Sequence, residues 1–225
     1  MIETLTPLTE TQAEVQRLAR DFARRELAPH TAAWDKAEAM PPEVLRKLGE
    51  LGFLGMLLPE EYGGMGLDSL AYLLALEEIA AADASVAVAM SVHNSLPTRM
   101  LLNNGSDAQR RAFLPKMATG EWLGAFALSE PDAGSDAVAL RTQAVRDGDD
   151  WILEGTKAWV TNGNCAQVII AMARTASRKT KSQHEINAGA SNGSNTRRKP
   201  TSAGAPATAA ASSSSGWICM TPSCP

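Results

Sequence analysis

The sequence predicts an α+β protein, in which an N-terminal all-α helical domain is followed by a truncated antiparallel β domain. Up to about residue 121, apolar residues recur at helical spacing between helix-capping signals. From Trp122 onward, short runs rich in β-branched and aromatic residues are separated by Gly, Asp and Asn turns. Because helices and strands come in blocks, and no G-x-G-x-x-G motif follows a strand, a Rossmann domain is disfavoured.

The first two helices are defined by their ends. Thr9 and Gln12 are spaced as a capping box, which starts the first helix, and Pro29 ends its apolar pattern. The second helix follows the Pro41-Pro42 pair and ends at Gly52. Both carry apolar residues three and four positions apart, which predicts that one face of each helix is buried.

Three more helices complete this block. The third starts at Asp68 and carries Leu70 and Leu73 among its apolar side chains. The fourth, from about residue 85 to residue 103, is apolar nearly all round, which predicts a position at the centre of a helical bundle. The fifth opens with another capping box, at Ser106.

Five strand-like runs follow, divided by short turns. They are Trp122 to Leu128, Leu140 to Val145, Trp151 to Glu154, Lys157 to Thr161 and Gln167 to Ala173. On the fourth run, the two-residue period of a strand puts Trp159 and Thr161 on one face and Val160 on the other. A flat indole beside a hydroxyl could pack on a flavin ring and hydrogen-bond its polar edge. Simple packing of Trp159 on the sheet is the alternative.

The segment Ala127-Leu128-Ser129-Glu130-Pro131-Asp132-Ala133-Gly134-Ser135-Asp136 is expected to contain a tight turn. Pro131 fixes its own φ and Gly134 can adopt a positive φ, so the backbone N–H groups should point outward. With the hydroxyls of Ser129 and Ser135 at its rims, such a turn suits a pyrophosphate or the carbonyl edge of a heteroaromatic ring. A plain β-turn closed by Ser and Asp is the alternative.

Two stretches together carry a family resemblance. The turn segment at 127–136 and the run Lys157-Ala158-Trp159-Val160-Thr161-Asn162 resemble the paired flavin-binding signatures of the acyl-CoA dehydrogenases. Two upstream segments, Pro59 to Asp68 and Met90 to Leu96, also look like segments of that family, the second most like its short-chain branch. The resemblance extends from about residue 8 to residue 175.

The resemblance implies an FAD cofactor and a set of contacts to it. The positions that match the family's flavin-binding residues are Phe126, Leu128, Ser129, Ser135, Trp159, Val160 and Thr161. The first three would line the flavin, and Trp159 and Thr161 would contact the isoalloxazine ring, with Val160 between them. Ser135 would lie near the flavin pyrophosphate and the thioester-pantetheine path of an acyl-CoA substrate.

The same resemblance implies an activity and partners. In the family, a carboxylate removes the α-proton of an acyl-CoA and the β-hydrogen leaves as hydride to FAD, which gives a trans-2-enoyl-CoA in fatty-acid β-oxidation. Electrons then pass to an electron-transfer flavoprotein, and the intact enzyme is expected to be a homo-oligomer, a tetramer. The family's catalytic Glu lies in a C-terminal helical domain beyond the end of this chain. No catalytic residue is therefore assigned, and the chain as written is expected to be inactive.

Two other functions stay open on the residues alone. One is a non-catalytic helical module that binds partners through an exposed apolar face. The other is an oxidase or monooxygenase relative on the same fold, which the motifs do not distinguish from a dehydrogenase.

The last fifty residues differ from the rest. Between 176 and 225, 28 residues are Ala, Ser, Thr or Gly and none is Leu, so this segment is expected to be a disordered tail after domains at 1–121 and 122–175. Six basic residues against Glu185 give it a charge of +5 and leave −9 on the preceding residues. Nucleic-acid binding is disfavoured, because the cations form two small groups with no aromatic between them. An unselected translation after loss of the reading frame is favoured.

Metal binding and a membrane partner are not expected. The Cys and His residues, which show no metal-ligand spacing, are Cys165, Cys219, Cys224, His30, His93 and His184. Of these, Cys165 is expected to be a small buried hydrophobe. No window approaches the roughly 18 apolar residues of a membrane span. The start lacks the features of a signal or transit peptide, so a cytoplasmic location is expected.

Overall fold

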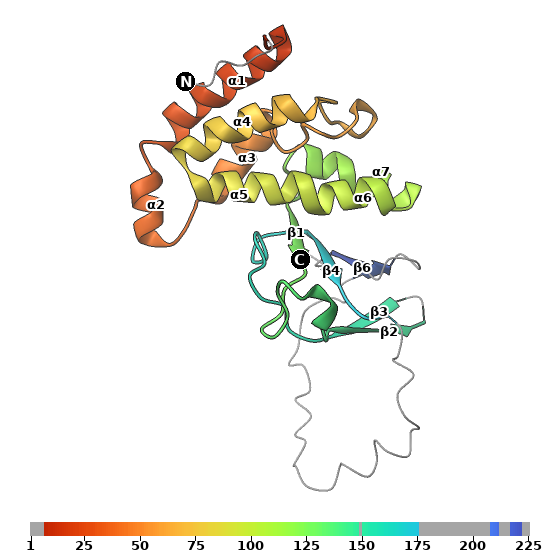
Figure 1. The fold of residues 1–225 in the computed structure, drawn as a ribbon. Helices are drawn as coiled ribbons and strands as arrows, with labels where there is room; N and C mark the ends of the chain where they lie inside the picture. The colour runs from red at the N-terminus through yellow and green to blue at the C-terminus, as the bar shows by residue number, and fades with distance from the viewer. Residues whose placement is uncertain (1–6, 149, 176–207, 212–216, 222–225) are drawn as a thin grey trace, which may run out of the picture.

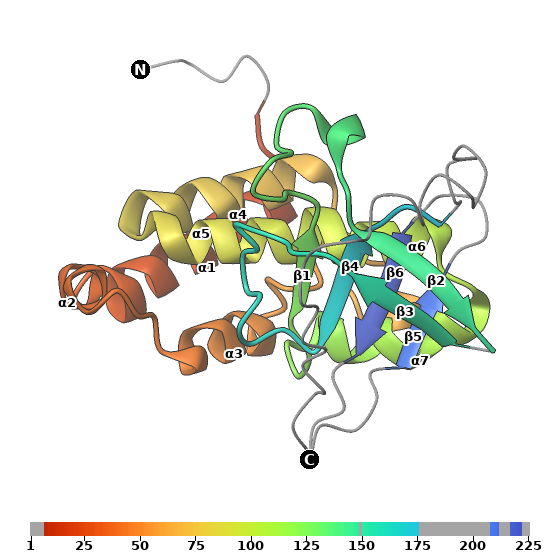
Figure 2. The ribbon, with the colours of Figure 1, turned by 90° about the horizontal axis from the view of Figure 1, so that it is seen from below.

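The computed structural model describes residues 7–148, 150–175, 208–211 and 217–221. Its helices form one layer, and its strands form a smaller layer against it (Figure 1). Viewed from below, the strands lie across the helices α6 (Arg99–Asn104) and α7 (Asp107–Ala118) (Figure 2). Helices first and strands second confirm the expected α+β organisation.

The first helix begins as its sequence predicts. In α1 (Glu10–Phe22), the Thr9 hydroxyl accepts a hydrogen bond from the Gln12 backbone N–H at 3.2 Å, and the Gln12 side chain accepts one from the Thr9 N–H at 3.0 Å. This capping box satisfies two of the N–H groups that a helix start leaves without partners. The helix continues directly into η1 (Ala23–Leu27), a single π-helical turn.

The next two helices differ in how far the sequence predicts them. α3 (Pro42–Glu50) begins at the Pro pair and buries Val44, Leu45 and Leu48, as expected from their spacing. α2 (Thr31–Ala37) was not predicted. None of its residues is buried, so it has no apolar face that a periodicity argument could detect.

The helix α4 (Ser69–Ala82) starts where the sequence predicts, and two of its leucines face outward. Asp68 caps it by accepting a hydrogen bond from the Ala71 N–H at 2.8 Å. Its buried residues are Ala71, Tyr72, Ala75 and Ile79. Leu70 and Leu73, by contrast, are 47% and 55% exposed. Two of the buried residues are alanines, whose small side chains allow α4 to pack on both α1 and the helix that follows it.

The fourth predicted helix is a run of three helical segments. α5 (Ala84–His93) passes through the π-helical turn η3 (Asn94–Thr98) into α6. The wider π turn accommodates Pro97, which has no N–H and would disrupt a regular α-helix at this point. Val86 and Met90 on α5 are fully buried, which confirms the central position.

The strands begin after α7, whose capping box at Ser106 is also confirmed. Two 3-10 turns, η2 (Glu60–Tyr62) and η4 (Ala137–Ala139), lie in connecting segments. The larger sheet contains, in spatial order, β1 (Gly124–Ala127), β4 (Val168–Met172), β6 (Trp217–Thr221) and β5 (Thr208–Ala211). The smaller sheet is a hairpin of β2 (Gln143–Asp147) and β3 (Asp150–Glu154). β1 and β4 pair in parallel, and the other described pairs are antiparallel.

The strand expected at 157–161 is wrong. The structure has an irregular loop there, and Trp159 and Asn162 have φ values of +58° and +63°. These left-handed conformations are incompatible with an extended strand and are uncommon for residues other than glycine.

The expectation of a disordered tail at 176–225 lies largely outside the described residues. Within that range the structure describes only β5 and β6, and β6 pairs with β4. The domain boundaries expected at 121 and 175 stay predictions.

The buried apolar residues form one large core within the helices and a second core between the helices and the sheet. The second core joins Leu101, Leu114 and Met117 with Val168 and Ile170 of β4. A third, small cluster of buried apolar residues joins Ala144 of β2 with Ala173, which follows β4. The strand layer is therefore stabilised mainly by the helices beneath it.

Candidate functional site

The two signature stretches of the sequence lie against each other. The Ala158 N–H donates to the Ser129 carbonyl at 2.9 Å. The Lys157 ammonium donates to the Leu128 carbonyl at 3.0 Å and to Glu130 Oε1 at 2.8 Å. Segments nearly thirty residues apart thus form one wall.

A small hollow of about 170 Å³ opens at this wall. Its lining residues are Val92, Leu96, Phe126, Leu128, Ser129, Trp159 and Thr161. Five of these are flavin-contact residues expected from the sequence. Val92 and Leu96, from α5 and η3, were missed as site residues, because an apolar pattern in a helix predicts burial without specifying what the side chain faces.

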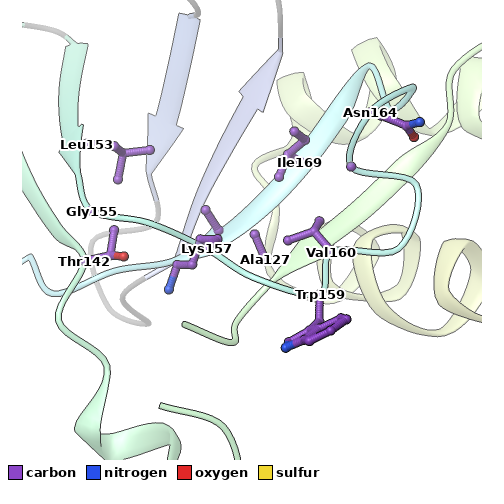
Figure 3. Close-up of a pocket in the computed structure, with 11 residues that line it drawn as sticks. Ala127, Thr142, Leu153, Gly155, Lys157, Trp159, Val160, Asn164 and Ile169 are labelled. Carbon is purple, nitrogen blue, oxygen red and sulfur yellow. The ribbon is translucent and has the colours of Figure 1, made fainter. Parts of the chain in front are cut away.

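Trp159 is the most exposed large apolar residue at this site. Its side chain is 94% exposed, so it does not pack on the sheet as the alternative reading supposed. The indole lies at the outer edge of a larger cavity, whereas Val160 and Ile169 point into that cavity (Figure 3). Trp159 and Thr161 line the small hollow and Val160 does not, so the expected division of these three residues holds although no strand produces it.

The turn after Ser129 differs in detail from the expectation. Glu130 and Ala133 exchange backbone hydrogen bonds of 2.8 and 3.1 Å, so these two N–H groups do not point outward. Gly134 does not adopt a positive φ. Ser135 is exposed and is not among the residues that line the hollow. Its contact with a pyrophosphate or an acyl-CoA stays a prediction.

Glu130 is a buried carboxylate that holds several segments together. It is 8% exposed and accepts hydrogen bonds from the Arg141 N–H at 2.6 Å, the Thr142 N–H at 2.9 Å and Lys157. Burial by itself raises the pKa of this carboxyl, but the hydrogen bonds from Lys157 and from the two backbone groups outweigh it and lower the pKa to about 2. Glu130 is therefore ionised and paired at neutral pH.

Asn162 attaches the Trp159 loop to the rest of the molecule. Its side-chain amide donates to the Gly124 carbonyl at 3.2 Å and to the Ala89 carbonyl at 3.4 Å. Its own carbonyl accepts from the Cys165 N–H at 3.0 Å. Cys165 itself is only half-buried, less than expected, and burial raises the pKa of its thiol.

His93 joins the helical layer to the first strand. The Gly124 N–H donates to His93 Nδ1 at 3.0 Å, and Nε2 lies 3.1 Å from the Met117 carbonyl. Since Nδ1 accepts, the proton is on Nε2, which donates to Met117. The ring is fully buried, and burial lowers its pKa to about 4. His93 is thus a neutral structural bridge.

The larger cavity, of about 570 Å³, lies behind the loop on the outer face of the β1–β4 pair. Ala127, Ile169 and Ala171 line it from the strands, and Leu153 and Thr142 line it from the hairpin side (Figure 3). This face of the sheet is opposite to the one that packs on α6 and α7, because alternate residues of β4 point to opposite sides.

Three absences hold for the described part of the chain. No group of three or more His, Cys, Asp or Glu side chains is arranged to bind a metal ion there. None of the residues that line the small hollow carries a carboxylate. Among the described helices, none has both the length and the apolar character needed to cross a bilayer.

Comparisons with known proteins identify the family of the chain. A family model for the acyl-CoA dehydrogenase N-terminal domain matches residues 9–121, and one for the acyl-CoA dehydrogenase middle domain matches residues 125–214. The chain is 41% identical over 169 residues to an acyl-CoA dehydrogenase of Bacillus subtilis and 46% identical over 168 residues to the mitochondrial short-chain specific acyl-CoA dehydrogenase of Rattus norvegicus. Each alignment covers 75% of this chain, but 45% and 41% of the respective relative.

A solved structure gives the same result. Glutaryl-CoA dehydrogenase of Mycobacterium smegmatis in complex with FADH2 superposes with a TM-score of 0.71 at 38% identity, over 74% of this chain and 43% of that one. The chain therefore spans less than half the length of the relatives it matches. With both family models matched in order and the same arrangement of helices and strands, this chain belongs to the acyl-CoA dehydrogenase family.

Proposed function

We propose that the described residues form the flavin-binding wall of an FAD-dependent acyl-CoA dehydrogenase. The observation that carries this proposal is the small hollow beside the exposed indole of Trp159, where five sequence-predicted contact residues meet. A flat aromatic face next to two hydroxyls suits the ring and the polar edge of an isoalloxazine. The related dehydrogenase that binds FADH2 supports the same assignment.

The donors at the hollow fit this group. The hydroxyl-bearing residues Ser129 and Thr161 both line the hollow, where their hydroxyls could bond a ligand. Trp159 presents an indole that little else in the described chain covers. Val92, Leu96 and Phe126 supply apolar walls that would exclude water. The site thus combines an aromatic surface for stacking, hydroxyl groups for hydrogen bonds and apolar walls.

The chemistry is divided between the cofactor and the protein. Bound FAD would accept a hydride from the β-carbon of an acyl-CoA. Removal of the α-proton requires a positioned carboxylate, and the residues that line the hollow contain none. We therefore infer that this chain by itself does not turn over. In the full-length arrangement, the substrate class is an acyl-CoA thioester, the electron acceptor is an electron-transfer flavoprotein and the assembly is a homotetramer.

Flavin titration tests the proposal. Trp159→Ala and Ser129→Ala should each weaken FAD binding by the full chain roughly fivefold to tenfold, because an aromatic stack or a hydrogen bond contributes on the order of 1 kcal/mol. Cys165→Ala is the matched control, since Cys165 lies outside the hollow, and should leave the affinity unchanged. Equal affinities in all three variants would remove the assignment.

Turnover tests the division of labour. The purified chain with added FAD, butyryl-CoA or longer acyl-CoAs and an artificial electron acceptor should bleach the acceptor at the background rate. Glu185 is the sole carboxylate after residue 175 in the sequence. Bleaching above background that Glu185→Gln abolishes would contradict the proposal and make Glu185 the base.

A protein-binding role is a second candidate, favoured by one observation. Leu70 and Leu73 are about half exposed on α4, and Val88 on α5 is 51% exposed. If these side chains belong to one contiguous apolar patch, that patch would suit a contact with another protein. If such a contact is the main function, Leu73→Ser should change the oligomeric state in size-exclusion chromatography while leaving FAD affinity unchanged.

A further inference from the structure

We propose that Lys157 and Glu130 are a positioning pair, which fixes the loop that carries Trp159 against the turn that carries Ser129 before any cofactor binds. The inference rests on the proposed flavin site and assigns to it two residues that do not line the hollow. Neither residue would touch the flavin. Their role would be to hold the two halves of its wall in register.

The pair is largely withdrawn from solvent. The side chain of Lys157 is 14% exposed and that of Glu130 is 6% exposed. The other ion pairs of the described chain have at least one partner whose side chain is more than a third exposed. A buried pair keeps one geometry, because separating the two groups would leave each buried charge without a partner, at a high cost in free energy. Lys157–Glu130 is therefore the fixed pair among these.

Lys157 joins two points of the same turn. An ammonium has three donors, and two of them reach the Leu128 carbonyl at 3.0 Å and Glu130 Oε1 at 2.8 Å. These acceptors lie on either side of Ser129. The neighbouring Ala158 N–H reaches the Ser129 carbonyl itself at 2.9 Å. The start of the Trp159 loop is thus bonded to three consecutive residues of the turn.

Glu130 extends the attachment to a third segment. Its carboxylate also accepts the N–H groups of Arg141 and Thr142, which lead into β2. The turn, the strand entry and the Trp159 loop therefore share one carboxylate. Its second oxygen would keep a backbone bond if Lys157 were replaced, so loss of the ammonium should free the loop more than the turn.

The loop needs such an attachment because it lacks the hydrogen bonds of a strand. No described strand contains residues 157–161, and Trp159 adopts a left-handed conformation that its own side chain disfavours. A strained conformation persists where surrounding contacts determine it. Asn162 fixes the far end of the loop, and Lys157 fixes the near end.

Amide exchange tests the pair without a cofactor. In the full chain, Lys157→Met should speed hydrogen exchange of the Ala158 N–H at least about tenfold, because opening of the loop would no longer break two ammonium bonds. The Val86 N–H, which caps α5 through Asp83, should be unaffected. Lys47→Met is the matched control: it removes a lysine that pairs with Glu26 far from the hollow and should change neither amide.

FAD binding tests the consequence for the site. Lys157→Met should weaken FAD affinity at least about tenfold and reduce the quenching of flavin fluorescence by Trp159, and Lys157→Arg should recover part of both. The double variant Glu130→Gln with Lys157→Met removes both charges, so it should regain thermal stability but not FAD affinity. It also keeps the test valid if the single Met variant does not fold.

The outcomes separate the two proposals. Failure of the unaltered chain to bind FAD would contradict the proposed function, while faster Ala158 exchange in Lys157→Met would still support the ordering of the loop by the pair. Unchanged Ala158 exchange would overturn the positioning role. A double variant that binds FAD as tightly as the unaltered chain would also overturn it, since the pair would then serve stability alone.

Discussion

The two faces of the β1–β4 pair are stabilised in different ways. On one face, Val168 and Ile170 are fully buried against helix residues such as Leu114. On the other face, Ile169 and Ala171 line an open cavity of about 570 Å³. One strand therefore has a packed side and a hollow side.

The two faces of this strand pair are held in place by different kinds of contact. The packed face depends on apolar burial, which is strong and has little directional preference. The face that lines the larger cavity is bounded by the Trp159 loop. This loop is held in place by specific polar contacts, those of Lys157, Glu130 and Asn162. The candidate site lies on the loop, so its geometry depends on the weaker and more directional of the two kinds of contact.

Two neighbouring isoleucines provide the largest expected contrast. Ile170→Ala should lower the free energy of unfolding by roughly 2–5 kcal/mol, because Ile170 is fully buried in the core between helices and sheet. Ile169→Ala removes the same atoms from the hollow face and should cost about 1 kcal/mol. Urea unfolding of both variants measures the difference. Equal losses would mean that the two faces are equally packed.

Acid should weaken the junction between the layers through His93. Its pKa is about 4 when folded against an ordinary value of 6.5, so stability is unaffected above pH 6.5 and falls as the pH drops from 6.5 to 4, because the unfolded chain then binds a proton that the folded chain does not. By pH 5 the loss should be roughly 2 kcal/mol. Urea unfolding between pH 7 and pH 5 measures it, with His93→Gln as the control that should flatten this pH dependence.

Protonation of Glu130 should lower the free energy of unfolding at a lower pH than protonation of His93 does. Its effect should fall on the face of the sheet that lines the larger cavity. Because its folded pKa of about 2 lies below the ordinary 4.5, its contribution is present above pH 4.5 and is lost as the pH falls towards 2. Glu130→Gln should remove this second acid transition and leave the first one, from His93, in place. A single transition in the unaltered chain that both substitutions shift equally would contradict the separate assignment.

Two glycines should give a contrast in the sign of the effect. A Cβ on Gly124 would lie 2.6 Å from Pro97 Cγ and 2.8 Å from Met117 Cε, so Gly124→Ala should cost roughly 1–3 kcal/mol through overpacking at the packed face. A Cβ on Gly134 would meet nothing within 4 Å, and its φ is not positive, so Gly134→Ala should be neutral or stabilise by up to about 1 kcal/mol. Thermal melting of the two variants checks the sign of each effect.

Most helix starts could be predicted from the sequence because capping is local chemistry. Thr9 and Asp68 each bond a backbone N–H only three residues away, so the pattern of residues contains the interaction. α2 could not be predicted, since it buries no side chain. The outward position of Leu70 and Leu73 was also missed, because their spacing fits a buried face equally well.

The candidate site could be predicted in part. The family resemblance identifies Ser129 and Trp159, and the structure places both at one hollow. The conformation of the Trp159 loop could not be derived, because it depends on bonds to Leu128 and to Gly124, residues far away in the chain. Period-two alternation predicts a strand from this run and contains no information about such bonds.

The π turn in the central helix sets a requirement on chain length. A π turn contains one residue more than an α turn, and each residue of an α-helix advances the side chains by about 100°. Deletion of one residue within η3 would therefore restore an α turn and leave Leu101, which is fully buried, facing the core, whereas one residue more or fewer in the α-helical segments on either side would rotate it by about that angle. The π turn thus takes up one extra residue while Val92 stays at the hollow and Leu101 stays in the core between the helices and the sheet.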